Sequence, residues 1–168
     1  MSRRPEWNSA ALYDRELSRA ATFGEIETVR RRLAAGAYVN ARDGFGATPL
    51  MMAAANGGLA VARVLIDAGA EVNVADVRGV TPLYYFIARG DVEAANLLLD
   101  LGADAKVRGG NGISLVHDAV LRCRQAPGGI ALIRRLIAAG ADPHQPNEHG
   151  VTPAQVAQTY GVRLDDEG

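Results

Sequence analysis

The sequence predicts an all-α fold, a solenoid in which one helical unit recurs about five times along the chain. A start of the form Gly-x-Thr-Pro-Leu places a hydroxyl residue at one equivalent position, with spacings of 33, 33 and 38 residues between Thr48, Thr81, Ser114 and Thr152. A Gly-Ala pair keeps the same spacings, beginning at Gly36, Gly69, Gly102 and Gly140. Two independent markers with one period in this range indicate a repeat array.

The first unit, residues 8–40, has the features of an end cap. Asn8 or Ser9 is placed to cap its first helix. Its second helix has a narrow apolar stripe, and Arg31 and Arg32 stand where the complete internal copy has two aliphatic residues. A terminal repeat has a neighbour on one side and water on the other, so we expect a helix that is apolar on one side only.

The two internal units, residues 41–74 and 75–107, carry boundary signals for two helices each. Thr48 and Thr81 can accept a hydrogen bond from an unpaired amide, and the proline after each suits the first helical position. Gly69 and Gly102 permit a left-handed exit from the second helix.

The last two units depart from this pattern. The fourth, residues 108–145, has Leu115 in place of the proline and five extra residues between its helices, where an insertion lengthens a surface loop. The fifth, residues 146–162, has a first helix followed by too few residues for a second. Two alternatives stay open: the first helix closes the array with Val162 and Leu164 packed on it, or the natural cap is missing.

The period and the Thr-Pro-Leu starts resemble the ankyrin repeat, a turn followed by two helices with the pattern T-P-L-H-x-A. The resemblance covers roughly residues 12–162. It implies one domain over residues 1–168, built of stacked helix-turn-helix units with projecting β-hairpin-like fingers. It also implies a non-catalytic module that binds a protein partner on a concave groove, formed by the finger tips and the exposed face of each first helix.

Composition sets limits on the function. The formal net charge of −1 gives no overall electrostatic reason to bind nucleic acid or an anionic membrane. All but one of the 18 basic residues are arginine, which fits carboxylate or phosphate recognition and also a GC-rich, bacterial coding bias. Cys123 is the only cysteine, so an internal disulfide is excluded, and no apolar run approaches the length of a membrane span. We expect a soluble, cytoplasmic monomer.

The residues with chemical potential have simpler interpretations as structural residues. His117 matches the histidine of the repeat pattern, for which the resemblance implies a structural role. His144 and His149 fall in a turn, where solvated histidines are more common than metal ligands. The glycine run at residues 108–112 lacks the Lys-Ser/Thr ending of a phosphate-binding loop. We therefore predict no enzyme activity, no cofactor and no metal.

The predicted partner-binding residues lie on the first helices and the fingers, because residues three and four positions apart share one helix face. Arginine and aromatic residues, which are enriched at interface hot spots, are frequent among them, and Tyr85 is expected to contribute most. The predicted site consists of Arg19, Phe23, Arg42, Phe45, Met52, Asn56, Arg78, Tyr85, Arg89, Arg108, Asn111, Asp118 and Arg122.

This composition favours an acidic protein surface or an extended acidic segment as the partner. One alternative is an inhibitor or immunity-type protein that covers the active site of a partner enzyme. Another is nucleic-acid binding through the row of arginines and aromatics, with steep salt dependence. A third is that arginine is simply this chain's default polar residue and marks no site. An enzyme has the least support, because no paired carboxylates or nucleophile and base can be placed together.

Overall fold

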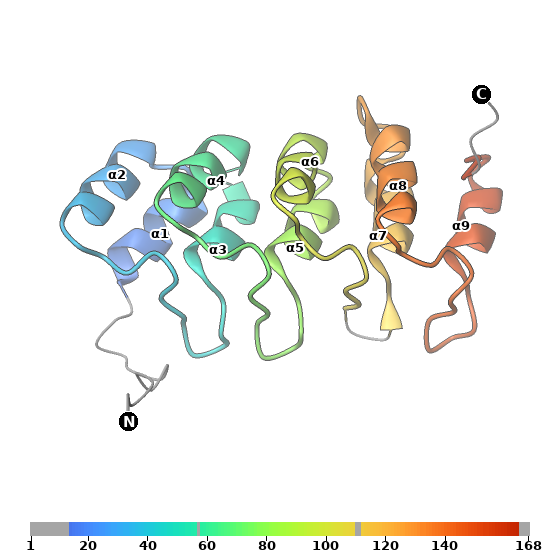
Figure 1. Cartoon of the computed structure of the whole chain (residues 1–168), viewed down its shortest axis with the longest axis horizontal. Helices are drawn as coiled ribbons and strands as arrows, with labels where there is room; N and C mark the ends of the chain where they lie inside the picture. The colour runs from blue at the N-terminus through green and yellow to red at the C-terminus, as the bar shows by residue number, and fades with distance from the viewer. Residues whose placement is uncertain (1–13, 57, 110–111, 165–168) are drawn as a thin grey trace. The chain divides into compact units, whose positions relative to one another are not determined.

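The structure is a computed structural model that describes residues 14–56, 58–109 and 112–164. Within these ranges the chain is all-α, with α1 to α8 arranged in pairs and α9 last (Figure 1); its β structure is an isolated bridge between Arg108 and Ser114. The chain forms two compact units, residues 1–71 and 72–168. We call them the N-terminal unit and the C-terminal unit.

The N-terminal unit holds two helix pairs: α1 (Arg15–Phe23) with α2 (Ile26–Ala34), and α3 (Pro49–Asn56) with α4 (Gly58–Asp67). The first helices α1 and α3 pack together, and the second helices α2 and α4 do the same. Each helix contributes at least one fully buried aliphatic side chain to the core: Leu17, Val29, Leu50, and Val61 with Leu65. Burial of a side chain of this size stabilises a fold by about 1.5–3 kcal/mol, so these contacts hold the pairs together.

Charged residues tie α2 to the start of α1. The Oδ1 atom of Asp14 accepts a hydrogen bond from the Leu17 amide at 2.8 Å and caps α1. Its Oδ2 atom accepts from the Nη2 atom of Arg32 at 2.5 Å, and Arg31 pairs with Glu16 at 2.7 Å. The arginines that replace aliphatic residues in this unit therefore bind acids of α1. The N-cap is Asp14; Asn8 and Ser9, which we expected to cap this helix, lie outside the described residues.

The C-terminal unit contains five helices among its described residues, which are α5 (Pro82–Ala88), α6 (Val92–Asp100), α7 (Leu115–Cys123), α8 (Gly129–Ala138) and α9 (Pro153–Thr159). The first helices pack in the order α5, α7, α9, and the second helices α6 and α8 each pack on their own first helix and on each other. Arg135 of α8 adds polar contacts to α6, to Asp100 at 2.5 Å and to the Oδ1 atom of Asn96 at 3.1 Å.

The helix starts follow the predicted chemistry with one exception. Ser114 and Thr152 form capping boxes at the starts of α7 and α9. Thr48 accepts a hydrogen bond from the Met51 amide at 3.4 Å. Thr81 makes no side-chain capping bond, so that expectation was wrong. Its Oγ1 atom is buried and has no hydrogen-bond partner among the described residues, although Thr48 and Thr152, which are also followed by proline, both cap their helices.

An Asx turn shapes three of the fingers. Asp43, Asp76 and Asn147 each accept hydrogen bonds through one side-chain oxygen from the amides two and four residues later, at 2.8–3.0 Å. Gly109 occupies the equivalent place in the remaining finger, and its amide still donates to the Ile113 carbonyl at 2.8 Å. A Cβ atom on Gly109 would lie only 2.6 Å from the Cζ atom of Tyr84. The tyrosine ring thus takes the space that an Asx side chain uses elsewhere.

Candidate partner-binding site

The first-helix face of the N-terminal unit offers an aromatic contact. Phe23, at the end of α1, is 61% exposed. On α3, which packs against α1, Met52 is half-buried and Asn56 is exposed. Arg19 forms two hydrogen bonds with the carboxylate of Glu25, at 2.9 and 3.1 Å. The acid neutralises the arginine, so the main feature of this face is Phe23.

The finger of the N-terminal unit presents a second aromatic side chain. Phe45 is 73% exposed, and Arg42 is exposed nearby in the sequence. The Asx turn at Asp43 holds the amides of Phe45 and Ala47, so the backbone at the finger tip is fixed. A large apolar side chain on a fixed turn loses little entropy when a partner covers it.

Tyr85, Arg78 and Asp76 form a closed hydrogen-bonded cluster in the C-terminal unit. The Tyr85 hydroxyl donates to the Oδ2 atom of Asp76 at 2.8 Å and accepts from the Nη2 atom of Arg78. Arg78 also pairs with Asp76 at 3.1 Å, and its guanidinium lies 5.9 Å from the centre of the Tyr85 ring. The cluster attaches the finger of residues 75–80 to α5. The polar atom of Tyr85 is thus used by the fold, whereas the Arg78 side chain stays largely exposed.

The pKa values of this cluster follow from its geometry. Burial alone would raise the pKa of Asp76, but hydrogen bonds from the Val80 amide, the Tyr85 hydroxyl and Arg78 hold it below its ordinary value of 3.8. Burial and the hydrogen bond to the carboxylate raise the pKa of Tyr85. Both shifts favour the state with Asp76 charged and Tyr85 protonated. The finger attachment is therefore complete at neutral pH.

Asp118 is buried, contrary to its predicted place on an accessible surface. It is only 8% exposed, and the Tyr84 hydroxyl donates a hydrogen bond to it. Burial first, and then this bond, raise the pKa of Tyr84 above its ordinary value of 10.0. Asp118 therefore offers little surface to a partner in this structure.

Arg108 also makes its hydrogen bonds within the protein. Its Nη2 atom donates to the carbonyl oxygen of Gly112 and, at 2.7 Å, to that of Pro146 in the next finger. The side chain therefore connects two successive fingers through its Nη2 atom, while its Nη1 atom is buried without a hydrogen-bond partner among the described residues. Asn111, the neighbouring predicted contact residue, lies outside the described residues.

Arg89 and Arg122 differ from the other predicted arginines of this unit. They occupy equivalent positions at the ends of α5 and α7, and both side chains are exposed. Neither guanidinium forms a hydrogen bond or an ion pair with another residue that the structure describes. A Cβ atom on Gly90, the residue after Arg89, would lie 3.3 Å from the Arg122 carbonyl oxygen, so the two helix ends are neighbours. Leu121, beside Arg122, is 40% exposed.

A stacked pair at the end of α9 is not evident from the sequence. The guanidinium of Arg124 lies 3.9 Å from the centre of the Tyr160 ring and donates to the carbonyls of Val120 and Leu121 at 3.1 and 2.6 Å. Arg124 belongs to the insertion that follows α7, so no internal copy has an equivalent residue. In the sequence, only the insertion could have indicated this pair, because an inserted segment makes contacts that the other repeats lack.

The chemically reactive residues have structural partners. The Nε2 atom of His117 lies 2.9 Å from the Val151 carbonyl oxygen, and Nδ1 lies 2.9 Å from the Ser114 hydroxyl oxygen, so this histidine joins α7 to the following finger. Cys123 is fully buried, and burial raises the pKa of its thiol to about 11, with Asp118 and Asp91 adding to the effect. A neutral, covered thiol is a poor nucleophile. Across the described ranges, no three His, Cys, Asp or Glu side chains come together as metal ligands would.

Comparison with known proteins addresses the repeat pattern directly. A family model described as ankyrin repeats matches residues 17–109 in three copies. A search of curated proteins found no match. None of the helices in the described parts of the chain is long and apolar enough to cross a membrane.

Proposed function

The chain belongs to the ankyrin repeat family, whose repeats are generally protein–protein interaction modules, and on this premise we propose that it binds an acidic segment of a protein partner through its C-terminal unit. The contact is made at the ends of α5 and α7, by Arg89, Leu121 and Arg122. The observation that carries the proposal is the exposure of Arg89 and Arg122, which lack ion-pair partners among the described residues.

The chemistry of these side chains selects the partner. A guanidinium presents several N–H donors in one plane, which match the two oxygens of a carboxylate and form charge-assisted hydrogen bonds. Exposed Leu121 adds an apolar contact beside Arg122. The fitting ligand is therefore a segment in which aspartate or glutamate residues flank an aliphatic or aromatic side chain.

Other predicted residues take different roles in the proposal. Arg78 can contact a partner only with the donors that Asp76 and Tyr85 leave available, and Arg108 positions the fingers. In the N-terminal unit, we propose Phe23 and Phe45 as apolar contacts, and Arg19, Arg42, Met52 and Asn56 as secondary contacts. We also propose that the protein has no catalytic activity of its own.

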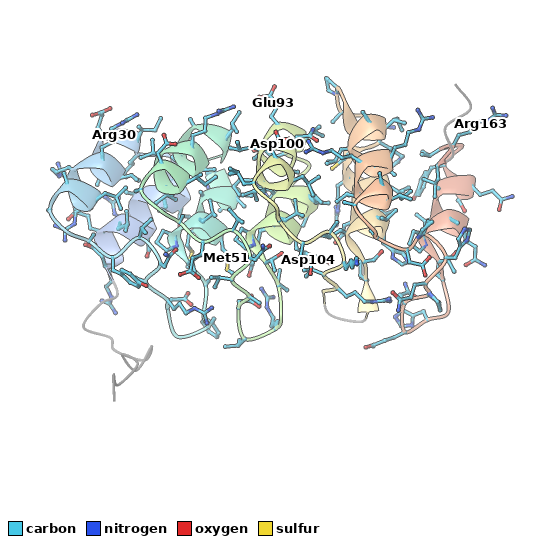
Figure 2. The ribbon with its side chains drawn as sticks, viewed as in Figure 1. Arg30, Met51, Glu93, Asp100, Asp104 and Arg163 are labelled. Atoms are coloured by element: carbon cyan, nitrogen blue, oxygen red, sulfur yellow. The ribbon has the colours of Figure 1, made fainter. Side chains whose placement is uncertain are left out.

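The experiment is a selection of random peptides displayed on phage, carried out with wild type and with Arg89→Glu/Arg122→Glu. The matched control is Arg30→Glu/Arg63→Glu, which makes the same change in net charge at exposed positions of the second helices α2 and α4. Figure 2 shows Arg30 on the side of the N-terminal unit opposite its finger. We expect wild type and the control to enrich acidic peptides that contain an apolar residue. Arg89→Glu/Arg122→Glu should not enrich such peptides.

Two results would contradict the proposal. Enrichment of the same acidic peptides by Arg89→Glu/Arg122→Glu would show that these arginines are not the contact. Binding of single-stranded oligonucleotides in preference to the selected peptides, with an affinity that falls steeply as salt rises, would assign the arginines to nucleic acid instead.

A further inference from the structure

Tyr160, which directly follows α9, holds the same place in its repeat as Arg89 and Arg122 of the proposed contact. Each of these residues stands eight positions after the hydroxyl residue that precedes its first helix. The first helices pack in the order α5, α7, α9, so the three equivalent positions follow one another along one face of the C-terminal unit. The row that begins with two arginines therefore continues with a tyrosine.

Contacts between the helix ends make this row continuous. The end of α5 meets the end of α7, because a Cβ atom on Gly90 would lie 3.3 Å from the Arg122 carbonyl oxygen. The end of α7 meets the end of α9 through Arg124. Its Nη1 atom donates to the Leu121 carbonyl at 2.6 Å, and its guanidinium lies 3.9 Å from the centre of the Tyr160 ring. The Leu121 backbone and the Tyr160 ring thus share one guanidinium, which places the two residues side by side.

The Tyr160 ring is exposed but held in place. Tyr160 is 48% exposed, and Leu121 beside it is 40% exposed. Arg124 lies over the ring, and hydrogen bonds to the carbonyls of Val120 and Leu121 fix the position of its guanidinium. A side chain that is already ordered loses little entropy when a partner covers it, and an aromatic ring is stabilised further by pairing with a second ring. These two side chains therefore suit an aromatic group.

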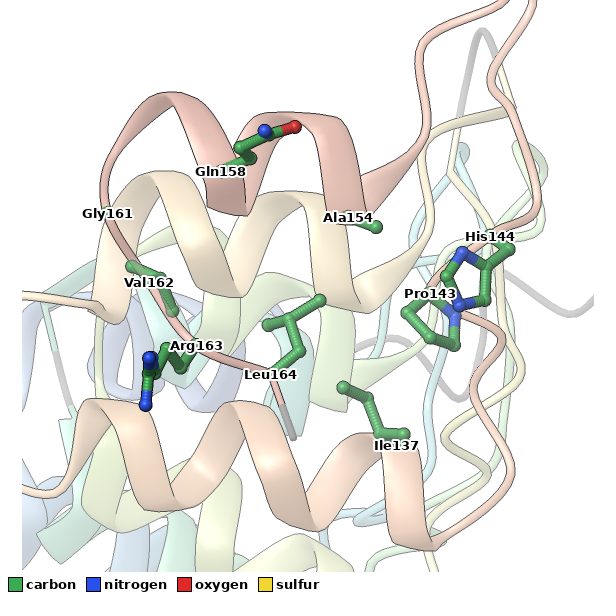
Figure 3. A pocket seen from close by; sticks show the side chains of 9 residues that line it. All are labelled: Ile137, Pro143, His144, Ala154, Gln158, Gly161, Val162, Arg163 and Leu164. Carbon is green, nitrogen blue, oxygen red and sulfur yellow. The ribbon is translucent and has the colours of Figure 1, made fainter. Parts of the chain in front are cut away.

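This surface is separate from the cavity that adjoins α9. Figure 3 shows the cavity, of about 690 Å³, between α8, α9 and residues 161–164. Gln158 and Gly161, on either side of Tyr160 in the sequence, contribute to its lining, whereas the Tyr160 ring packs on Arg124.

We propose that Tyr160 and Leu121 hold an aromatic side chain of the acidic segment whose carboxylates bind Arg89 and Arg122. This inference rests on the proposed function, because Tyr160 extends the same row of side chains, and it adds the class and the place of the partner's apolar residue. Tyr160 is thus a further contact residue, in contrast to Tyr85, whose hydroxyl is bonded within the fold.

The spacing of the first helices sets the spacing of residues in the partner. Packed helices lie about 8–10 Å apart and an extended chain advances about 3.3 Å per residue, so neighbouring first helices correspond to about three residues of the segment. The partner segment then carries two acids three residues apart and an aromatic residue three residues further on. Both chain directions satisfy this spacing.

The probe is a synthetic peptide with blocked ends, Glu-Ser-Gly-Glu-Ser-Gly-Phe, and its reversed sequence. Two matched peptides are made for each direction: one has alanine in place of phenylalanine, and the other exchanges the phenylalanine with the nearer serine, which keeps the composition. Each peptide is titrated into the full-length protein at low salt, and amide chemical shifts in NMR report the affinity and the place of binding. In one direction, the probe should bind wild type about 3- to 10-fold more tightly than both matched peptides, with shifts at the ends of α5, α7 and α9.

Four variants test the assignment to Tyr160. Tyr160→Ala removes the ring and should bind the phenylalanine and alanine peptides equally. Tyr160→Leu keeps an apolar side chain and should also lose the preference, which provides the test if Tyr160→Ala does not fold. Tyr160→Phe keeps the ring and should keep the preference. Leu101→Ala, which removes a side chain of similar exposure, 45%, at the end of the second helix α6, should match wild type.

Three outcomes would overturn the inference. They are equal binding of the phenylalanine and alanine peptides by wild type in both directions, an unchanged preference in both Tyr160→Leu and folded Tyr160→Ala, and loss of the preference in Tyr160→Phe. Each leaves the proposed function standing as long as Arg89→Glu/Arg122→Glu loses affinity for all the acidic peptides. If that variant binds them as tightly as wild type does, the proposed function fails and the inference fails with it.

Discussion

Three side chains meet beside the finger of residues 75–80, and their hydrogen bonds decide what each can do for a partner. Asp76 is buried and accepts from Tyr85 and Arg78, and the Tyr85 hydroxyl also accepts from Arg78, so the hydroxyl proton of Tyr85 is already used within the fold. Arg89 lies only a few residues away and has no such contact with the described chain. Tyr85 and Arg89 look equally suited to binding in the sequence, but the Tyr85 hydroxyl is bonded within the fold and the Arg89 guanidinium is available to a partner.

The Tyr85→Phe variant tests the role of the hydroxyl. It removes hydrogen bonds to Asp76 and Arg78 while it keeps the ring, so we expect the free energy of unfolding to fall by about 1–2 kcal/mol. Urea denaturation measures this loss. Unchanged stability combined with lost peptide binding would mean that the hydroxyl contacts the partner instead.

The lowered pKa of Asp76 predicts a specific pH dependence. A group whose pKa is lower in the folded state contributes stability above its unfolded pKa, here 3.8, and loses it as the pH falls through the still lower folded value. The difference in unfolding free energy between wild type and Asp76→Asn should therefore be constant above about pH 5 and shrink below it. Both proteins contain Asp14, which is also shifted downward, so the difference isolates Asp76. A difference that grows as the pH falls from 5 to 3 would contradict the assignment.

At the scale of elements, the third residue of α5 and the third residue of α7 each touch the next finger. Tyr84 packs on Gly109, and His117 reaches the Val151 carbonyl. These contacts, which lie 25 and 34 residues apart in the chain, set the spacing between fingers. The glycine at 109 is required by the tyrosine ring and is no phosphate-binding feature.

The Gly109→Ala variant tests this packing. Its new methyl group would overlap the Tyr84 ring, so we expect a loss of about 1–3 kcal/mol in unfolding free energy. Gly44→Ala is the control, because a Cβ atom there has nothing within 4 Å, and its effect should stay within about 0.5 kcal/mol. The cost of Gly109→Ala should also shrink in a Tyr84→Ala background. An undiminished cost in that background would place the strain elsewhere.

At the scale of the whole molecule, the repeat period determines most of the fold. The prediction of an ankyrin repeat protein is confirmed by the family match, and the all-α fold is confirmed by the helices of the described chain. The Thr-Pro pairs marked three helix starts, at Pro49, Pro82 and Pro153. Local signals sufficed because each repeat uses the same caps and turns.

The details of the site could not be read from the sequence in the same way. The burial of Asp118 depends on Tyr84, and the attachment of Tyr85 depends on Asp76 in a finger that folds back onto α5. Such pairs are set by tertiary packing, and helix periodicity gives only the face on which a residue lies. Which of the predicted arginines can contact a partner therefore becomes clear only from the contacts of each guanidinium.

The most direct test of the central claim is a charge exchange between the protein and a selected acidic peptide, measured by fluorescence anisotropy. Arg89→Glu/Arg122→Glu should weaken binding about 30-fold or more, whereas Arg30→Glu/Arg63→Glu should stay close to wild type. A peptide with lysine in place of the acids should bind Arg89→Glu/Arg122→Glu and should not bind the other two proteins. Equal binding of the acidic peptide by all three proteins, or no recovery with the lysine peptide, would contradict the account.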